Sequence, residues 1–294
     1  MRGPRRRTEE QARAFKPAVL GARDARAQRA HVGAQAFFLS ERDRAVIAEI
    51  KRRARSESTF NKKTECFTIQ EDNGKGGTRT VRLRGLVPAL KELFYPTYRF
   101  IGRTGGKEKA PVVGASGASA KGKGTSRAGI DRGHRVDVEV QRCIQSGTMK
   151  PECRATRHVL SAMLKMGLKP VLAQVPVHGA SIGLRVGTAV DVVCLDASSR
   201  PHIIEVKTGY ANYYDAACGK LKGVMSHVDS APRSHHQMQL LMTCDLFEQT
   251  TKIKPAGAMV LRVIASGVQY IKLDTAIRNK LTGIRSTLQG KYPV

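Results

Sequence analysis

The stretch 187–207, GTAVDVVCLDASSRPHIIEVK, decides the fold and the place of the chemistry. Its first part, 188–195, and its last part, 202–207, are rich in Val and Ile, which is typical of buried β-strands. The polar residues between them predict a turn, so the two strands are expected to be neighbours. Residues two apart in a strand point to the same side, so the side chains of Glu205 and Lys207 should emerge together.

Asp191 is an acid inside an apolar strand, where an ionised carboxylate is costly unless it is paired or binds a metal. If the two strands are neighbours, Asp191 approaches Glu205 and Lys207. Two carboxylates and a backbone carbonyl, that of Val206, suit Mg²⁺ or Mn²⁺, which prefer oxygen ligands. An ammonium group beside them can orient a water molecule or accept its proton. The alternative for Glu205 and Lys207 alone is a surface salt bridge at a strand end.

Helices and further strands are predicted on both sides of this stretch. The expected helices are 132–146, 152–166, 234–249 and 275–288. The expected strands are 170–177, 256–264 and 268–273, the last two as a hairpin. The order helix, three strands, helix, strand, strand predicts an α/β fold with a central mixed sheet flanked by helices.

Composition divides the rest of the chain. Residues 1–35 are rich in Arg, Ala, Gln and Gly and predict a flexible basic arm. Residues 36–101 predict a small α+β unit, with a helix that starts at Ser40 and a β-hairpin after it. Residues 102–128 are dominated by Gly, Ser, Ala and Lys and predict a flexible linker. This leaves 129–294 as the main domain.

The net charge indicates the class of partner. The chain has 51 Lys and Arg against 24 Asp and Glu, which gives a formal charge of +27. A protein this basic usually meets a polyanion, because neutralising phosphates releases condensed counterions. We expect nucleic acid and no membrane, since no basic amphipathic helix with an aromatic apolar face is evident.

Two features bear on the compartment. The N-terminal segment MRGPRRRTEE has no apolar stretch after it, and the six cysteines form no CxxC pair. These features predict an intracellular, reducing location and no secretion. The run of arginines at 5–7 fits part of a nuclear import signal, and the alternative is a solvated arm.

Four segments carry a family resemblance: RGHRVDVEV (132–140), GTAVDVV (187–193), IIEVK (203–207) and HHQMQLLM (235–242). With them, the chain resembles the PD-(D/E)xK nuclease superfamily, and within it the lambda exonuclease and RecB-like branch, over residues 130–274. The resemblance implies a restriction-endonuclease-like core.

The resemblance also implies a site. The catalytic residues implied are Asp191, Glu205, Lys207 and Gln239. The metal ligands implied are Asp137, Asp191, Glu205 and the carbonyl of Val206, with Glu139 as the alternative to Asp137 on the first helix. Gln237 would lie at the DNA.

The activity implied is hydrolysis of phosphodiester bonds in DNA with Mg²⁺ or Mn²⁺, by an exonuclease rather than an endonuclease. Recombination, repair or end processing would use it. The substrate implied is double-stranded DNA with frayed or single-stranded ends. A single-strand-annealing partner, an oligomeric ring, and action in the nucleus or at a viral or phage replication site would all be consistent with this branch.

The loop 208–233 combines aromatic and basic residues, which suits stacking on unpaired bases and holding phosphates. The DNA contacts expected from it are Tyr210, Lys220, Lys222 and Arg233. The alternative is that its tyrosines, which include Tyr213 and Tyr214, pack the loop onto the core.

Two other interpretations stay open. No proline precedes Asp191, and Asp137 stands where the branch usually has Glu or His. The first alternative is therefore a catalytically inactive nucleic-acid-binding or packaging protein that retains the fold. The second is a subunit of a larger assembly that docks through 36–101.

Overall fold

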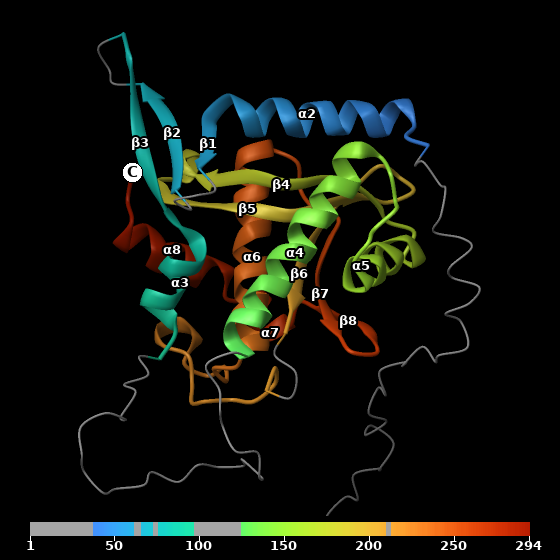
Figure 1. Ribbon diagram of the computed structural model, residues 1–294. Helices are drawn as coiled ribbons and strands as arrows, with labels where there is room; N and C mark the ends of the chain where they lie inside the picture. Colours follow the sequence, from blue (N-terminus) through green and yellow to red (C-terminus); the bar gives the residue numbers. More distant parts are fainter. Residues whose placement is uncertain (1–37, 62–65, 73–75, 97–124, 210–212) are drawn as a thin grey trace, which may run out of the picture.

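A mixed β-sheet with helices on both faces organises the chain (Figure 1). The computed structural model describes residues 38–61, 66–72, 76–96, 125–209 and 213–294. The strands follow the order β1-β2-β3-β5-β6-β7-β8, and β4 pairs with β5 off this path, which makes eight. The predicted α/β fold with a central mixed sheet flanked by helices is confirmed.

The strands are β1 (Ser58–Asn61), β2 (Cys66–Asp72), β3 (Thr78–Gly85), β4 (Lys169–Gly179), β5 (Leu184–Leu195), β6 (Pro201–Thr208), β7 (Gly257–Ile264) and β8 (Gly267–Lys272). The α-helices are α2 (Glu41–Glu57), α3 (Leu86–Phe94), α4 (Thr125–Ser146), α5 (Arg154–Lys165), α6 (Pro232–Thr251), α7 (Thr275–Arg278) and α8 (Leu281–Lys291), with short 3-10 turns at Ala180–Ile182 and Gly223–Met225. None of the helices in these ranges is long and apolar enough to cross a membrane.

Several elements differ from the expectation, and α4 begins at Thr125 rather than at residue 132. The short strand β1 was not predicted, because four residues, STFN, carry too little alternation to be recognised. The helix expected at 275–288 is interrupted and forms α7 and α8 instead.

β5 is the strand around which the sheet is built. β4 pairs with it antiparallel from Leu184 to Leu195 and so occupies one of its edges. Two strands share the other edge: β3 pairs in parallel with residues 186–187, and β6 pairs antiparallel with residues 192–195. Among the described strands, none pairs with residues 188–191 on that edge, and β6 leaves β5 next to Asp191.

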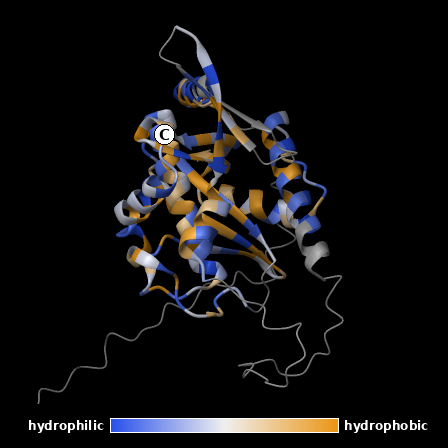
Figure 2. Ribbon diagram, turned by 90° about the vertical axis from the view of Figure 1, so that its left-hand side faces the viewer, coloured by the Kyte–Doolittle hydropathy of each residue, from blue (hydrophilic) through white to orange (hydrophobic). Residues whose placement is uncertain are grey.

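The central strands are buried on both faces, which explains their nearly continuous apolar sequence. On one face, Val192, Ile204 and Leu261 pack against α4 and α5. On the other face, Val193 and Ile203 pack against α6. Figure 1 shows α4 and α5 in front of the sheet with α6 behind it, and in Figure 2 hydrophobic residues run along the central strands.

The helix predicted to start at Ser40 does so. Ser40 Oγ accepts a hydrogen bond from the N–H of Asp43 at 3.1 Å, and Asp43 Oδ2 accepts one from the N–H of Ser40 at 2.9 Å. This reciprocal pair is a capping box, in which the two side chains satisfy two backbone donors that the helix itself leaves unpaired.

The α+β unit expected at 36–101 contains the predicted helix and hairpin, but its strands belong to the same sheet as the main domain. Its apolar residues Ile50 and Leu90 are fully buried in the same core cluster as Met238 of α6. So short a segment buries little apolar surface by itself, so it completes its core against the rest of the chain. The expected arm 1–35 and residues 102–124 of the expected linker lie outside the described residues, and α4 begins at Thr125.

Candidate active site at the end of β6

β5 and β6 separate at Asp191. Their last paired residues are Val192 and Ile204, and continuing that register by one residue places Asp191 opposite Glu205. The backbone N–H of Val206 donates to Asp191 Oδ2 at 2.9 Å instead of to a backbone carbonyl of β5. In an extended strand, the N–H and C=O of one residue point to the same edge, so the Val206 carbonyl also faces this gap. The oxygen atoms that were expected to bind a metal, those of Asp191, Glu205 and the Val206 carbonyl, therefore lie in the same gap between β5 and β6.

Glu205 is almost completely buried, with 1% of its surface exposed. Its Oε1 accepts a hydrogen bond from Gln239 Nε2 at 2.7 Å and forms an ion pair with Lys207 Nζ. Its Oε2 is buried and has no hydrogen-bond partner among the described residues. A buried carboxylate oxygen without a partner is costly unless a cation or a proton compensates it. Glu205 Oε2 therefore fits a metal ligand.

The charges of the site shift one another's pKa values. Burial raises the pKa of Glu205 well above its ordinary range, and the nearby charge of Asp191 raises it further. Burial alone would lower the pKa of Lys207, but the negative charges of Glu205, Asp191 and Asp137 raise it above its ordinary value. Lys207 is therefore an ammonium group at neutral pH, which suits it to orient a water molecule rather than to take its proton.

Asp137 approaches the site from α4. Gly133, one turn earlier, packs so closely on β6 that a Cβ added there would lie 2.9 Å from Thr208 Oγ1. This close packing brings Asp137 near enough to Lys207 to raise its pKa. Within the described ranges, however, no three His, Cys, Asp or Glu side chains converge as a metal site. The structure therefore places Asp137 beside Lys207, and its expected role as a metal ligand stays a prediction.

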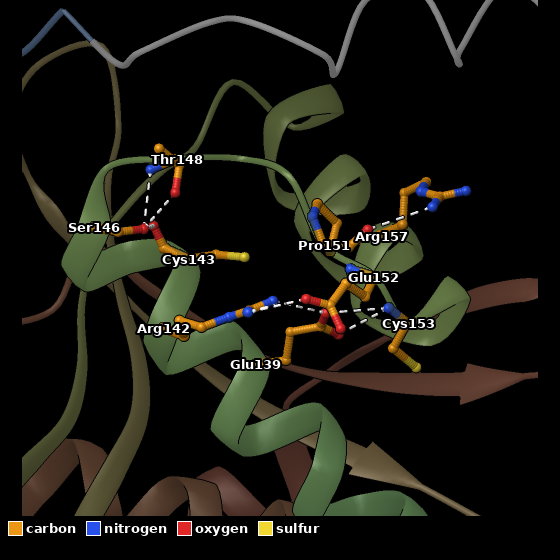
Figure 3. A network of polar contacts seen from close by, with 9 residues as sticks. All are labelled: Glu139, Arg142, Cys143, Ser146, Thr148, Pro151, Glu152, Cys153 and Arg157. Carbon is orange, nitrogen blue, oxygen red and sulfur yellow. Dashed lines mark hydrogen bonds and ion pairs between the residues drawn. The ribbon is translucent and has the colours of Figure 1, made fainter.

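Glu139, the alternative acid on α4, serves the fold (Figure 3). Its buried Oε1 accepts hydrogen bonds from the backbone N–H groups of Glu152 at 2.5 Å and Cys153 at 3.1 Å. Cys153 is the N-cap residue of α5 and makes no side-chain cap of its own. Glu139 thus supplies the missing acceptor at the start of α5, and Arg142 pairs with it at 3.3 Å.

We expect Glu139→Ala to lower the free energy of unfolding by about 2 kcal/mol, because it leaves two backbone donors without an acceptor. Urea unfolding followed by circular dichroism measures this. The control is Glu152→Ala, since that carboxylate pairs with the same Arg142 but is 82% exposed. Its loss should stay within about 0.5 kcal/mol. Equal losses in both variants would show that the ion pairs with Arg142 matter, and not the cap.

α6 reaches the site with Gln239, whereas Gln237 points elsewhere, because residues two apart on a helix do not share a face. Gln237 is buried, and its Oε1 accepts a hydrogen bond from the N–H of Asp274, the N-cap residue of α7, at 2.8 Å. The expectation that Gln237 contacts DNA is therefore corrected: it holds the start of α7 against α6.

Two of the basic residues expected to hold DNA are paired with acids of the same loop region. Lys220 Nζ lies 2.7 Å from Asp229 Oδ1, and Arg233 Nη1 lies 3.3 Å from Asp215 Oδ1. All four side chains are exposed, so these pairs are weak and phosphates can compete for the cations. The structure therefore places both residues at the surface, with their charge partly neutralised.

Lys222 and Tyr210 are the other two residues of this loop that were expected to contact DNA. Lys222 is half-buried, and its backbone N–H donates to the carbonyl of Phe94 at 2.7 Å, which ties this part of the loop to the end of α3. Tyr210 falls in 210–212, outside the described residues. Its expected contact with DNA stays a prediction.

A buried polar cluster beside Lys207 was missed by the sequence reasoning. Arg262 of β7 is the register partner of Lys207, so both side chains lie on the same face of the sheet. The Arg262 guanidinium carbon lies 4.3 Å from the centroid of the Tyr214 ring, and Tyr214 OH lies 3.2 Å from His236 Nδ1. Burial holds the pKa of His236 far below its usual range, so its imidazole is neutral. The signal for this cluster was an arginine in the middle of the apolar strand GAMVLRVI.

Neighbouring strands, one helix and one loop thus bring Asp191, Glu205, Lys207 and Gln239 together, with Arg262, Tyr214 and His236 packed beside them. Comparison with known proteins found no family model and no curated protein that matches the chain.

Proposed function

We propose that the chain is a metal-dependent DNA nuclease with a restriction-endonuclease-like core and a catalytic centre of the PD-(D/E)xK type. One observation carries the proposal: Asp191 and Glu205 come from neighbouring strands and meet where those strands separate, and Lys207 pairs with Glu205 there. Two acids and a lysine in this arrangement suit metal-assisted hydrolysis of a phosphodiester.

The donor set assigns a role to each group. Asp191, Glu205 and the Val206 carbonyl would hold Mg²⁺ or Mn²⁺, which would supply Lewis-acid stabilisation of the charge that builds on the phosphate. Gln239 and Lys207 both contact Glu205 Oε1, which leaves Oε2 for the ion. Lys207 keeps its proton on Nζ and positions the attacking water beside the phosphate.

The proposed substrate is DNA, with exonuclease action preferred over endonuclease action. The formal charge of +27 supports a polyanionic substrate, because phosphate neutralisation supplies affinity that does not depend on base sequence. The preference for exonuclease action, and for a role in recombination, repair or end processing, rests on the resemblance to the lambda exonuclease and RecB-like branch.

The test is the degradation of linear duplex DNA labelled at one end, with Mg²⁺, Mn²⁺ or EDTA. We expect loss of the DNA with either metal and none with EDTA. Closed circular duplex DNA is the control for the mode of attack, since an exonuclease leaves it intact and an endonuclease cuts it. If no condition gives cleavage while salt-sensitive binding persists, the nuclease proposal is wrong.

A catalytically inactive nucleic-acid-binding or packaging protein is the second candidate. Its support is the same high positive charge, together with two departures from the branch: no proline precedes Asp191, and Asp137 stands where the branch usually has Glu or His. The discriminating measurement is the slope of binding affinity against salt concentration in a protein that shows no cleavage. A steep slope without cleavage supports the binding protein.

A further inference from the structure

We propose that Tyr213 stacks on an unpaired base and so directs a single-stranded DNA end into the site. This inference rests on the proposed nuclease function for the identity of its ligand. It adds a residue and a substrate feature: a nucleotide whose base is not paired. Two adjacent tyrosines, Tyr213 and Tyr214, differ sharply in burial.

Tyr213 is 57% exposed, whereas Tyr214 beside it is 1% exposed. More than half of the surface of Tyr213 is thus in contact with solvent, directly beside a buried tyrosine. Both faces of a DNA base are apolar, and an exposed ring gives such a face a surface to stack on. Tyr214 therefore acts as an anchor in the core, and Tyr213 offers its ring to a ligand from solvent.

Several contacts fix the anchor. The Tyr214 ring packs under the guanidinium of Arg262, and its hydroxyl contacts His236 Nδ1. The Tyr214 carbonyl accepts a hydrogen bond from the N–H of Arg233 at 3.0 Å, and the Tyr213 carbonyl accepts one from the N–H of Ala216 at 3.2 Å. The backbone at Tyr213 and directly after it is therefore held in place, which lowers the entropy lost when a base stacks on the ring.

The anchor also sets the distance from the reacting groups. Arg262, which covers Tyr214, is the register partner of Lys207, and paired strands lie about 4.8 Å apart. Burial raises the pKa of Tyr214 to about 12, and the charges of Arg262 and Lys207 act against that rise. Tyr214 is thus within electrostatic reach of Lys207, and Tyr213 is the next residue along the chain.

Stacking fits this part of the loop better than a phosphate clamp does. The charges of Lys220 and Arg233 are partly neutralised by Asp229 and Asp215, so these two residues attract a phosphate less strongly than unpaired cations would. The π face of Tyr213 is attractive to any base, but the bases inside a duplex are covered by their neighbours. An unpaired nucleotide at an end or in an overhang has an uncovered face, so it is the ligand that this ring selects.

The experiment is a binding cycle measured by fluorescence anisotropy in EDTA, where no cleavage interferes. The probes are a blunt duplex, duplexes with a 5′ or a 3′ single-stranded overhang, and the same overhangs made of abasic nucleotides. Abasic overhangs keep the phosphates but lack the bases. The proteins are wild type, Tyr213→Ala, Tyr213→Phe and the matched control Tyr270→Ala. Tyr270 is 41% exposed and lies on β8 opposite Leu261, whose side chain packs on the other face of the sheet.

We expect Tyr213→Ala to weaken binding to at least one normal overhang by roughly 5- to 100-fold. Binding to the abasic overhangs and to the blunt duplex should be unchanged. Tyr213→Phe should bind like wild type, and Tyr270→Ala should show no selective loss. No change in Tyr213→Ala, or an equal loss with normal and abasic overhangs, would overturn the proposal.

The cycle is independent of catalysis. A protein that never cleaves DNA but shows the selective loss keeps the stacking role and loses the nuclease function. A protein that cleaves DNA with metal but shows no selective loss keeps the nuclease function and loses the stacking role.

Discussion

Substitution of Glu205 by glutamine is expected to slow DNA cleavage by about 1,000-fold or more, equivalent to about 4 kcal/mol of transition-state stabilisation. The amide keeps nearly the shape of the carboxylate but removes the negative charge from Oε2, the oxygen that has no hydrogen-bond partner among the described residues. Single-turnover cleavage of a linear duplex, with enzyme in excess, measures the chemical step directly.

Unfolding with and without metal shows whether this loss comes from the ion. Metal at one hundred times its dissociation constant should stabilise the wild-type protein by about 2.7 kcal/mol, and the variant by much less. The matched control is Glu152→Gln, an exposed acid at the start of α5 that should leave both cleavage and metal stabilisation unchanged. Full activity in Glu205→Gln would remove Glu205 from the catalytic centre.

Substitution of Lys207 by methionine is expected to slow cleavage by roughly 100- to 10,000-fold, because the positioned ammonium is lost while the stem of the side chain is kept. Metal stabilisation should persist, since both carboxylates remain. The two variants therefore separate the roles: Glu205→Gln loses the ion and the rate, and Lys207→Met loses the rate alone.

The same variant tests the charge balance of the metal-free site. Removal of the ammonium leaves Glu205 and Asp191 facing each other, and we expect the free energy of unfolding to fall by about 2 kcal/mol at neutral pH, a value reduced because Lys207 is partly exposed. Folding raises the pKa of Glu205, so protonation of this acid favours the folded state. Stability from this group is present below its unfolded pKa and is lost as pH rises through the raised value. The loss in Lys207→Met should therefore grow as pH increases. Lys207→Arg should restore the free energy of unfolding but not the cleavage rate. A loss of stability of the same size at every pH in Lys207→Met would contradict the ion pair between Lys207 and Glu205.

Local pattern was sufficient to predict the centre of the site. Period-two alternation placed Glu205 and Lys207 on one side of a strand, and an acid in an apolar run marked Asp191. These relations involve neighbours along the chain or two strands joined by a short turn. The structure brings all three groups together.

What the sequence did not predict depends on contacts between distant segments. Arg262 lies beside Lys207 because β6 and β7 pair in parallel after the whole of α6 has intervened. The choice between Gln237 and Gln239 depends on which side of α6 meets the sheet, since both are polar and both lie on the same helix. Glu139 accepts hydrogen bonds at the start of α5, and this contact with a separate helix is not visible in the local sequence pattern.

The junction between β3 and β5 has a mechanical consequence. Of the residues of β3, only the last two, Arg84 and Gly85, pair with β5. The residues before them pair with β2 and form the hairpin. At Gly187, an added Cβ would lie 3.1 Å from Phe67 Cγ and 3.2 Å from Leu83 Cδ1, so the hairpin rests against bare backbone. The hairpin is also attached by an ion pair between Glu71 and Arg185 of β5 at 3.8 Å, and by the packing of Ile69 in the same small cluster. The strands that carry Asp191 and Glu205 pack against helices on both faces of the sheet, so they do not depend on this hairpin for their position.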